Sequence, residues 1–258
     1  MEALLTIDEL SMVFGGLRAV DNLTMDVRKG EIHSLIGPNG AGKTTALNVI
    51  SGFYKPTKGI VRLDTKEIQG LDSSKISRKG LARTFQNVRL FRQLTVLENV
   101  QIGMYSRIHE GITGTLFHTP HFRKVNKEVV VAECLDLLGL IGLRDKAYFK
   151  VSNLSYGQQK VVEIARALAQ RPKILLLDEP AAGLNNTETF ELIKLVRGLQ
   201  EQGITVLLIE HNMRLVMNLS DRITVLNFGK KIAEGTSVEI QSNEEVIQAY
   251  LGKRREYA

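Results

Sequence analysis

GPNGAGKTT, residues 37–45, is the stretch that decides the fold. It follows the apolar segment HSLIG at 33–37 and opens the helix pattern TALNVISGF at 45–53. In that setting it matches G-x-x-x-x-G-K-[ST], a phosphate-binding loop whose glycines let backbone N–H groups turn inward around phosphate oxygens. The start of the following helix adds partial positive charge. A glycine turn that happens to carry a lysine is the weaker alternative.

The loop assigns nucleotide contacts to individual residues. Lys43 is expected to reach the β- and γ-phosphates, and the Thr44 hydroxyl is expected to ligate Mg²⁺. ATP and Mg²⁺ are therefore the expected ligands. The loop residues expected to bind the nucleotide are Gly37, Pro38, Asn39, Gly40, Ala41, Gly42, Lys43, Thr44 and Thr45.

A pair of acids, Asp178 and Glu179, ends the apolar run LLL at 175–177. Unpaired buried carboxylates are costly, so a cation or strong donors should lie near them. The carboxyl edge of a parallel sheet is also where ligands bind. Asp178 is expected to hold Mg²⁺, directly or through water, and Glu179 to act as general base on the attacking water. Solvation of a strand end explains such a pair equally well on its own, but the phosphate loop favours the catalytic interpretation.

The stretch LSYGQQK, residues 154–160, precedes a strong helix pattern. Ser155 and Gln158 form the capping box S-x-x-Q, so a helix should begin there. A well-capped helix is one interpretation. A helix start with a serine hydroxyl and Gly157 is also an anion site, although the chain already has one phosphate loop. The second site would then serve the nucleotide held by another copy of the protein.

Hydrophobic patterning predicts an α/β fold. After residue 173, strand and helix patterns alternate, which implies a parallel sheet with helices on both faces. ILLL at 174–177 and VLLI at 206–209 are the near-continuous apolar runs of strands covered on both sides. Strands are expected at 4–14, 23–27, 31–37, 61–64, 173–180, 204–211 and 222–229, and helices at 45–53, 189–203 and 212–220. A short helix followed by a strand is expected within ISRKGLARTFQ at 76–86.

The middle of the chain, from about 95 to 170, has helical patterning with little that predicts strand. Thr95 and Glu98 make a capping box, so a helix should start there. Residues 108–123 are rich in Gly, Thr, His and Pro, which indicates a loop or insertion. Because sheet strands are expected on both sides, the stretch is interpreted as a helical lobe, about 92–168, inserted into a single domain that spans 1–258.

Composition limits the class of protein. The 34 basic residues exceed the 28 acidic ones by a net +6 that is spread along the chain, so nucleic-acid binding is not expected. The single cysteine, Cys134, permits no disulfide within the chain and fits a reducing compartment. The N-terminus lacks the apolar block of a signal peptide, and no run approaches the roughly 18 apolar residues of a membrane span. Any membrane role is therefore expected to act through a partner.

Five motifs occur in one order: GPNGAGKTT, RTFQ with Gln86, LSYGQQK, ILLLDEP, and LLIEH with His211. This order resembles the ATP-binding subunits of ABC transporters over nearly the whole chain. The resemblance implies a P-loop NTPase (RecA-like) parallel-sheet core, an N-terminal antiparallel β-subdomain and an inserted α-helical lobe. It also implies that two subunits pack head to tail, so that each LSYGQQK motif closes on the γ-phosphate bound by the opposite phosphate loop.

The resemblance assigns roles to further residues. Phe14 matches the aromatic residue that stacks on adenine, with a core residue at a strand end as the alternative. Gln86 matches the glutamine that contacts Mg²⁺ or water and relays contact with a membrane subunit, and His211 matches the histidine that touches the γ-phosphate. The implied catalytic set is Glu179, His211, Lys43 and Gln86; the implied metal set is Thr44, Gln86 and Asp178; and Ser155, Gly157 and Gln158 are the implied contacts to the opposite nucleotide.

Two positions depart from the family pattern. Tyr156 stands where many members have glycine, and Asn185 stands where many have aspartate. Ser155 and Gly157 are kept, so the anion contact is expected to survive. Asn185 can still form hydrogen bonds but, unlike the aspartate, carries no charge.

Among these subunits the chain resembles the ATPases of bacterial branched-chain amino-acid importers. The stretches that carry this resemblance include SGFYKPTKG, ARTFQNVRLFRQLTVLENV, LDEPAAGLNN and the ending VIQAYLG. It implies an ATP-hydrolysing subunit that energises import as a peripheral protein on the cytoplasmic face of the inner membrane. The implied partners are a second ABC ATPase, identical or different, two multi-span membrane permeases and, indirectly, an extracytoplasmic solute-binding protein.

Three alternatives stay open. The first is that the chain is the ATPase of another transport system, since urea or amide importers and lipopolysaccharide exporters use related ATPases. A soluble ABC-type ATPase acting on DNA or ribosomes is the second, but such proteins usually carry two cassettes in one chain, a long coiled-coil insertion or cysteine zinc sites. The third is a degenerate cassette that binds ATP without turnover, and the presence of Glu179 and His211 argues against it.

Overall fold

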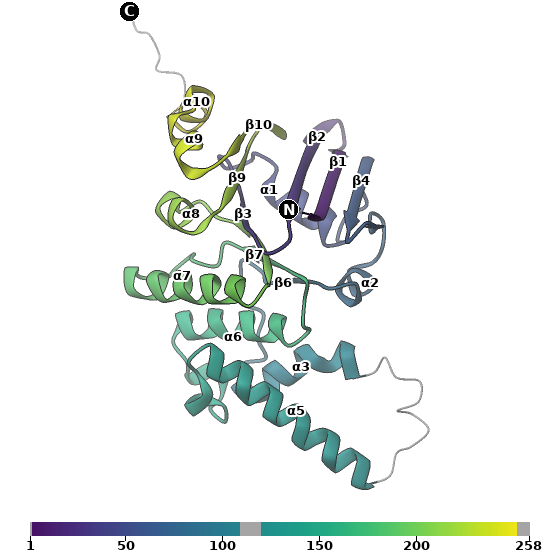
Figure 1. Cartoon of the computed structure of the whole chain (residues 1–258), viewed down its shortest axis with the longest axis vertical. Helices are drawn as coiled ribbons and strands as arrows, with labels where there is room; N and C mark the ends of the chain where they lie inside the picture. The colour runs from purple at the N-terminus through teal and green to yellow at the C-terminus, as the bar shows by residue number, and fades with distance from the viewer. Residues whose placement is uncertain (1, 109–119, 252–258) are drawn as a thin grey trace, which may run out of the picture.

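The computed structural model describes the backbone of residues 2–108 and 120–251 and the side chains of 2–104 and 128–250. Its strands form two sheets (Figure 1). The first sheet is antiparallel, in the order β2-β1-β4-β5. Its strands are β1 (Ala3–Phe14), β2 (Leu17–Arg28), β4 (Lys58–Leu63) and β5 (Lys66–Glu67). The implied N-terminal antiparallel sheet is therefore confirmed.

The second sheet is the predicted parallel core. Its order is β10-β9-β3-β8-β7-β6, and every neighbouring pair is parallel except β9 with the edge strand β10. The strands are β3 (Ile32–Ile36), β6 (Leu81–Arg83), β7 (Ile174–Asp178), β8 (Thr205–Ile209), β9 (Arg222–Asn227) and β10 (Lys230–Gly235). Every residue of β3, β7 and β8 is buried, as expected for parallel strands covered on both faces.

Helices flank this core sheet. Outside the middle of the chain they are α1 (Lys43–Ile50), α2 (Ser73–Arg78), α7 (Asn186–Glu201), α8 (Met213–Leu219), α9 (Ser237–Ser242) and α10 (Glu244–Leu251). Strands β5 and β10 and helices α9 and α10 lie outside the predicted elements. The polar segment KKIAEG of β10 shows no apolar alternation that would predict a strand. In the part of the chain described here, no helix is both long and apolar enough to cross a membrane.

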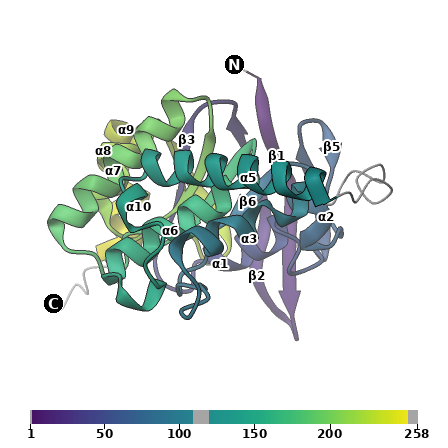
Figure 2. The ribbon, with the colours of Figure 1, turned by 90° about the horizontal axis from the view of Figure 1, so that it is seen from below.

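Between β6 and β7 the chain forms the predicted helical stretch. It consists of α3 (Val96–Ile108), α5 (Pro120–Leu140) and α6 (Tyr156–Leu168), with short 3-10 turns at Arg144–Lys146 and Val151–Asn153. We refer to α3, α5 and α6 as the helical lobe. The lobe encloses its own hydrophobic cluster, which includes Val100, Cys134 and Val162. Figure 2 shows α5 running alongside α3 and α6.

The loop expected at 108–123 is wrong at both edges. Ile108 belongs to α3, and α5 begins at Pro120. Proline suits the first position of a helix, because an N–H there would have no partner within the helix and the fixed φ of proline matches the helix. Residues 109–119 lie outside the described part of the chain.

The two faces of the core sheet carry different helices. Because successive side chains of a strand point to opposite faces, Ile174 and Leu176 of β7 pack with α1 and the antiparallel sheet. Leu175 and Leu177 pack on the other face with α6, α7 and α8. The helix that follows the phosphate loop and the helix that follows the LSYGQQK motif therefore lie on opposite faces of the same sheet.

Candidate active site

The phosphate loop ends in an uncapped helix start. Gly42 is the N-cap of α1 with φ 101°, and no side chain among the described residues caps the helix. A Cβ at Gly42 would lie 2.2 Å from the Ala19 carbonyl oxygen, so only glycine fits this close approach. Because the first N–H groups of a helix have no intrahelical partner, residues 43–45 present donors to an anion.

The Lys43 side chain folds back into the phosphate loop. Its Nζ donates to the carbonyl oxygens of Gly37 at 2.7 Å and Pro38 at 2.9 Å, and the residue is only 7% exposed. Burial lowers the pKa of Lys43, while the charges of Glu179 and Asp178 act in the opposite direction. The predicted phosphate-binding cation therefore lies within electrostatic reach of both predicted acids.

Asp178 ends β7 and is held by Arg83, a residue outside the predicted site. Arg83 Nη2 donates to Asp178 Oδ2 at 2.9 Å, and each side chain is 7% exposed. Arg83 Nη1 donates to the side chains of Asn48 on α1 and of Ser51, the C-cap of α1, at 2.8 and 2.7 Å. Arg83 thus connects α1 to the predicted metal ligand, and it leaves Asp178 Oδ1 for another partner. A charged residue in a short apolar strand was the available signal, since a buried charge needs a partner.

Three predicted residues meet at the carboxyl edge of the core sheet. Gln86 Nε2 donates to Glu179 Oε2 at 2.8 Å, and His211 Nδ1 lies 3.6 Å from the same oxygen. Glu179 has a left-handed backbone with φ 48°, a conformation that surrounding contacts must hold, and its N–H donates to the Ile209 carbonyl oxygen. The side chains of His211 and Glu179 are 59% and 21% exposed, so water and a phosphate group can reach the cluster.

Two buried charged residues that the motifs do not predict support this cluster. The fully buried Glu210 accepts hydrogen bonds from the N–H groups of Ala181 at 2.8 Å and His211 at 3.1 Å. Lys160 on α6 donates to the Gln86 carbonyl oxygen at 2.7 Å. Glu210 stands inside the LLIEH motif and Lys160 inside the LSYGQQK motif, and this position was the only sequence signal for either residue.

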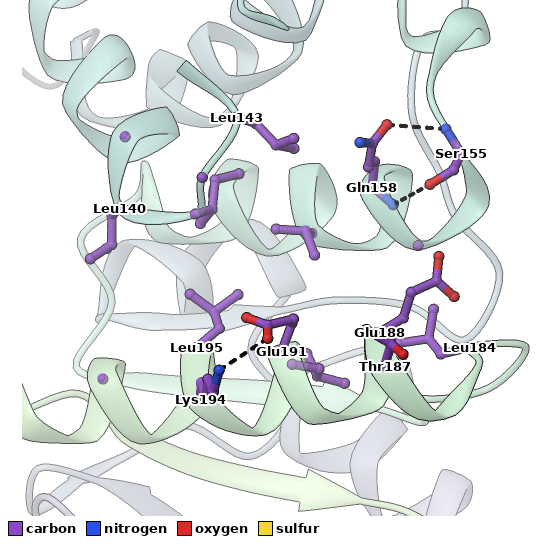
Figure 3. A pocket seen from close by; sticks show the side chains of 17 residues that line it. Leu140, Leu143, Ser155, Gln158, Leu184, Thr187, Glu188, Glu191, Lys194 and Leu195 are labelled. Carbon is purple, nitrogen blue, oxygen red and sulfur yellow. Dashed lines mark hydrogen bonds and ion pairs between the residues drawn. The ribbon is translucent and has the colours of Figure 1, made fainter. Parts of the chain in front are cut away.

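The predicted capping box at the start of α6 is confirmed. Ser155 Oγ accepts from the Gln158 N–H at 3.3 Å, and Gln158 Oε1 accepts from the Ser155 N–H at 3.2 Å (Figure 3). Among the described residues, no hydrogen bond or ion pair joins Ser155, Gly157 or Gln158 to the phosphate loop. Within one chain the structure therefore does not bring these three residues together with the other predicted site residues.

A groove of about 590 Å³ separates α6 from α7 beside this capping box. Figure 3 shows Ser155 and Gln158 on the α6 side, with Leu184 and Glu188 on the α7 side. The two helices approach closely at Gly157, where a Cβ would lie 2.4 Å from Glu188 Oε1. Glycine at this position therefore permits the start of α6 to pack against α7.

The two departures from the family pattern have local structural roles. Asn185 caps α7: its Oδ1 accepts from the Glu188 N–H at 2.9 Å, and Glu188 Oε2 accepts from the Asn185 N–H at 3.0 Å. The Tyr156 ring covers the neighbouring turn, since a Cβ on Gly183 would lie 2.9 Å from Tyr156 Cε1. Tyr156 thus packs the LSYGQQK motif against the turn after the acids, whereas Asn185 stabilises the start of α7.

Phe14 lies at the end of β1 and is 41% exposed. Its ring meets the ring of Tyr54 edge-on, with centroids 5.4 Å apart. Edge-on contacts are one of the arrangements that aromatic pairs prefer. The partial exposure of Phe14 fits a stacking surface better than the alternative of a core residue.

Oxygen atoms suited to Mg²⁺ come from three separate segments. Thr44 offers a hydroxyl, Asp178 its Oδ1, and Gln86 its Oε1, since the Gln86 amide nitrogen is engaged with Glu179. Mg²⁺ prefers such hard oxygens and usually binds through one or two carboxylates together with substrate phosphates. The described residues hold no cluster of three or more His, Cys, Asp or Glu that could bind a metal alone. The donor set therefore fits Mg²⁺ held jointly with a nucleotide.

Comparison with known proteins gives matches along the whole chain. A family model described as ABC transporter matches residues 20–182, and one described as branched-chain amino acid ATP-binding cassette transporter matches 230–256. The high-affinity branched-chain amino acid transport ATP-binding protein LivG of Salmonella typhimurium is 48% identical, with 98% of this chain and 99% of LivG covered. BraF of Pseudomonas aeruginosa, which carries the same description, is 47% identical, with 97% and 98% covered.

Solved structures of similar chains have the same architecture. The ADP conformation of an ATP-binding cassette from an ABC transporter superposes with a TM-score of 0.84 at 32% identity, covering 98% of this chain and 100% of that one. The dimeric structure of a bacterial ABC transporter cassette gives a TM-score of 0.76 at 28% identity, covering 90% and 98%. The likeness therefore extends over both sheets and the helical lobe.

Proposed function

The chain belongs to the ATP-binding proteins of ABC transporters, and from this premise we propose that it energises the transport of branched-chain amino acids. As a member of that family it binds nucleotide and couples ATP hydrolysis to transport. The observation that carries the proposed site is the cluster of Gln86, Glu179 and His211 at the sheet edge, within electrostatic reach of Lys43.

In the proposed reaction, a water molecule attacks the γ-phosphorus of ATP while Glu179 takes its proton as general base. The N–H groups of residues 43–45 hold phosphate oxygens, and the Lys43 ammonium turns from its two loop carbonyls to the β- and γ-phosphates. His211 donates to the γ-phosphate as the bond to ADP breaks, and ADP and inorganic phosphate leave. Phe14 stacks on the adenine.

Mg²⁺, when bound, neutralises charge that develops on the β- and γ-phosphate oxygens. Thr44, Asp178 and Gln86 are the residues proposed to hold it. Arg83 supports this assignment, because it pairs with Oδ2 of the Asp178 carboxylate and leaves Oδ1 for a cation.

A second cassette completes the site in this proposal. Ser155, Gly157 and Gln158 are assigned to the γ-phosphate held by the opposite chain, since the contacts within one chain do not join them to the phosphate loop. The dimeric structure of a similar cassette supports pairing of this kind. Each chain is proposed to be one ABC ATPase domain, 1–258, with the lobe inserted at about 92–168.

The substrate class and the partners rest on the relatives. Two similar proteins are described as branched-chain amino acid transport ATP-binding proteins, and the family model at 230–256 carries a matching description. We assign the chain to the cytoplasmic face of the membrane, on two multi-span permeases and beside an identical or different ATPase. A solute-binding protein outside the membrane would deliver the amino acid.

Glu179→Gln tests the catalytic site. The amide cannot take a proton from water, so ATP hydrolysis should fall by about 100-fold or more while Mg-ATP binding persists. The variant should accumulate as an ATP-bound dimer, alone or with its sister subunit, which size-exclusion chromatography with light scattering would detect. Glu191→Gln, a surface carboxylate on α7 with 63% of its side chain exposed, is the matched control. A Glu179→Gln protein that hydrolyses ATP normally would remove Glu179 from the proposed role.

Reconstitution tests the substrate class. The chain is purified in mild detergent with every protein that accompanies it, and the assembly is placed in liposomes. Leucine, isoleucine or valine with the binding protein should raise ATP hydrolysis several-fold. Stimulation by urea or short amides instead, or co-purification with a lipopolysaccharide-binding assembly, would overturn the amino-acid assignment while leaving the ATPase chemistry intact. Recovery of ribosomes or DNA in place of permeases would overturn the transport role.

A further inference from the structure

One face of α6 carries three charged residues at intervals of three: Lys160, Glu163 and Arg166. Residues three apart lie on the same side of a helix. Lys160 and Glu163 are only 3% and 2% exposed, and the Arg166 side chain is 18% exposed. Charged groups this deeply buried require partners, so this face of α6 must be paired with polar groups of another segment.

The partner is the backbone that follows β6. Lys160 Nζ donates to the Gln86 carbonyl oxygen at 2.7 Å. The Arg89 N–H donates to Glu163 Oε1 at 3.3 Å, and the Arg166 guanidinium donates to the Arg89 carbonyl oxygen. Lys160, Glu163 and Arg166 therefore all form hydrogen bonds with the main chain of residues 86–89. That segment begins with Gln86, whose side chain touches Glu179.

Lys160 extends this grip to the catalytic acid itself. Its Nζ also donates to the Glu179 carbonyl oxygen at 3.4 Å. Burial lowers the pKa of Lys160, whereas the negative charges of surrounding carboxylates act to raise it. Glu179 is the residue with φ 48°, so its backbone conformation depends on neighbouring contacts. One ammonium group thus binds the main chain of both residues that form the 2.8 Å contact between Gln86 Nε2 and Glu179 Oε2.

We propose that Lys160 is a positioning residue that couples the start of α6 to the catalytic acid of its own chain. Ser155, which caps α6, lies five residues before Lys160 on a rigid helix, so a shift of α6 moves the Lys160 ammonium with it. The ammonium then carries the Gln86 and Glu179 main chains to the geometry in which the attacking water is held. The proposal rests on the catalytic role assigned to Glu179 above.

Lys160→Met tests the coupling, because methionine keeps an unbranched side chain and removes the charge and the donors. A misplacement of about 1 Å costs on the order of 100-fold in rate, so kcat should fall about 10- to 100-fold. The KM for Mg-ATP should change less than about threefold, since the phosphate loop is untouched. Lys160→Arg, which keeps a cation with several donors, should recover most of the loss. Lys194→Met, on exposed α7 surface, is the matched control.

A double mutant separates this coupling from a general loss of structure. If Lys160 acts through Glu179, Lys160→Met should lower the residual single-turnover rate of Glu179→Gln by less than about twofold, because the two effects are not additive. Equal losses in both backgrounds would show that Lys160 acts elsewhere and would overturn the proposal. So would a kcat within twofold of the wild type in the single variant. Normal hydrolysis by Glu179→Gln would instead overturn the proposed catalytic site.

Thermal unfolding of each variant completes the test. If Lys160→Met does not fold, Lys160→Gln, which keeps an N–H donor without a charge, replaces it with the same expected direction. Loss of kcat that follows a lowered melting temperature, with KM raised in proportion and no recovery by Lys160→Arg, would assign Lys160 a structural role only and contradict the coupling.

Discussion

Helices α1 and α6 both begin at motifs assigned to phosphate, but their first turns are built differently. The N-cap of α1 is Gly42, and no side chain among the described residues caps that helix. At α6, Ser155 and Gln158 each accept a hydrogen bond from the backbone N–H of the other. The first N–H groups of α1 are left for an external anion, whereas at α6 the capping box already satisfies the N–H groups of Ser155 and Gln158.

This difference indicates that the start of α1 can bind a nucleotide by itself, whereas the start of α6 offers fewer donors. The phosphate loop offers several N–H groups and the Lys43 ammonium in one place. The Ser155 hydroxyl accepts one hydrogen bond and, in the described part of the chain, donates none. A hydroxyl has one donor to give, so Ser155 can add one hydrogen bond to a phosphate while the cap stays intact. We therefore expect ATP affinity to depend mainly on α1 and turnover to depend on both helices.

Lys43→Ala should have the largest effect and tests the α1 side of the comparison. Loss of the ammonium removes the positive charge that stabilises the γ-phosphate in the transition state, so the rate of phosphate release should fall about 100- to 1,000-fold. Binding of a fluorescent ATP analogue should weaken as well. Lys58→Ala, an exposed lysine paired with Glu9 at 3.3 Å, should leave both quantities unchanged. If Lys43→Ala still hydrolysed ATP at the wild-type rate, the role assigned to the phosphate loop before α1 would be wrong.

Ser155→Ala tests the α6 side and should have an intermediate effect. A hydrogen bond to a charged group contributes about 1.5–3 kcal/mol, so hydrolysis should fall about 10- to 100-fold while ATP binding to the single chain stays near normal. The lost cap should also cost about 1 kcal/mol of stability.

Thr236→Ala separates these two consequences. Thr236 forms the same kind of capping box at the start of α9, with Glu239 as its partner. Its loss should lower the free energy of unfolding by a similar amount, measured by urea denaturation, without lowering hydrolysis. If Thr236→Ala reduces hydrolysis as much as Ser155→Ala does, the effect at Ser155 is one of stability and the assignment to phosphate falls.

The elements that could be predicted are those whose pattern depends on local chemistry. The apolar runs of β7 and β8, the phosphate loop before α1 and the capping box before α6 each carry their signal within a few residues. Strand β10 could not be predicted in this way. Its polar sequence forms a strand because β9 offers a free edge for pairing, a feature that exists only once the sheet is built.

The candidate site divides in the same manner. Gln86, Glu179 and His211 are named by their motifs, and the structure brings them together at the sheet edge. Arg83 and Lys160 each carry a local signal, but their partners could not be predicted, because these lie 95 and 74 residues away in the sequence. Long-range pairs of this kind follow from the packing of β6, β7 and α6 and leave no local pattern.

Glu163→Gln should have the smallest effect, a change in how stability depends on pH, and it tests the buried charge of α6. Burial raises the pKa of Glu163 above its ordinary value of 4.5, whereas hydrogen bonding and nearby charge lower that pKa. The folded protein therefore keeps this proton to higher pH than the unfolded chain does. Between pH 4.5 and the raised pKa the folded state binds more protons, so the contribution of Glu163 to stability falls as pH rises.

Urea denaturation of the wild type and Glu163→Gln at a series of pH values measures this contribution as a difference. Carboxyl groups with lowered pKa values, such as Asp26 and Glu31, act in the opposite direction but are present in both proteins, so their effects cancel. The stability of the wild type relative to Glu163→Gln should decline from pH 4.5 upward and level off above the raised pKa. The glutamine can still accept the Arg89 N–H bond, which keeps the segment after β6 in place. A flat difference would mean that Arg166 and the Arg89 N–H balance the effect of burial on the pKa of Glu163, and a difference that grows with pH would mean that they outweigh it.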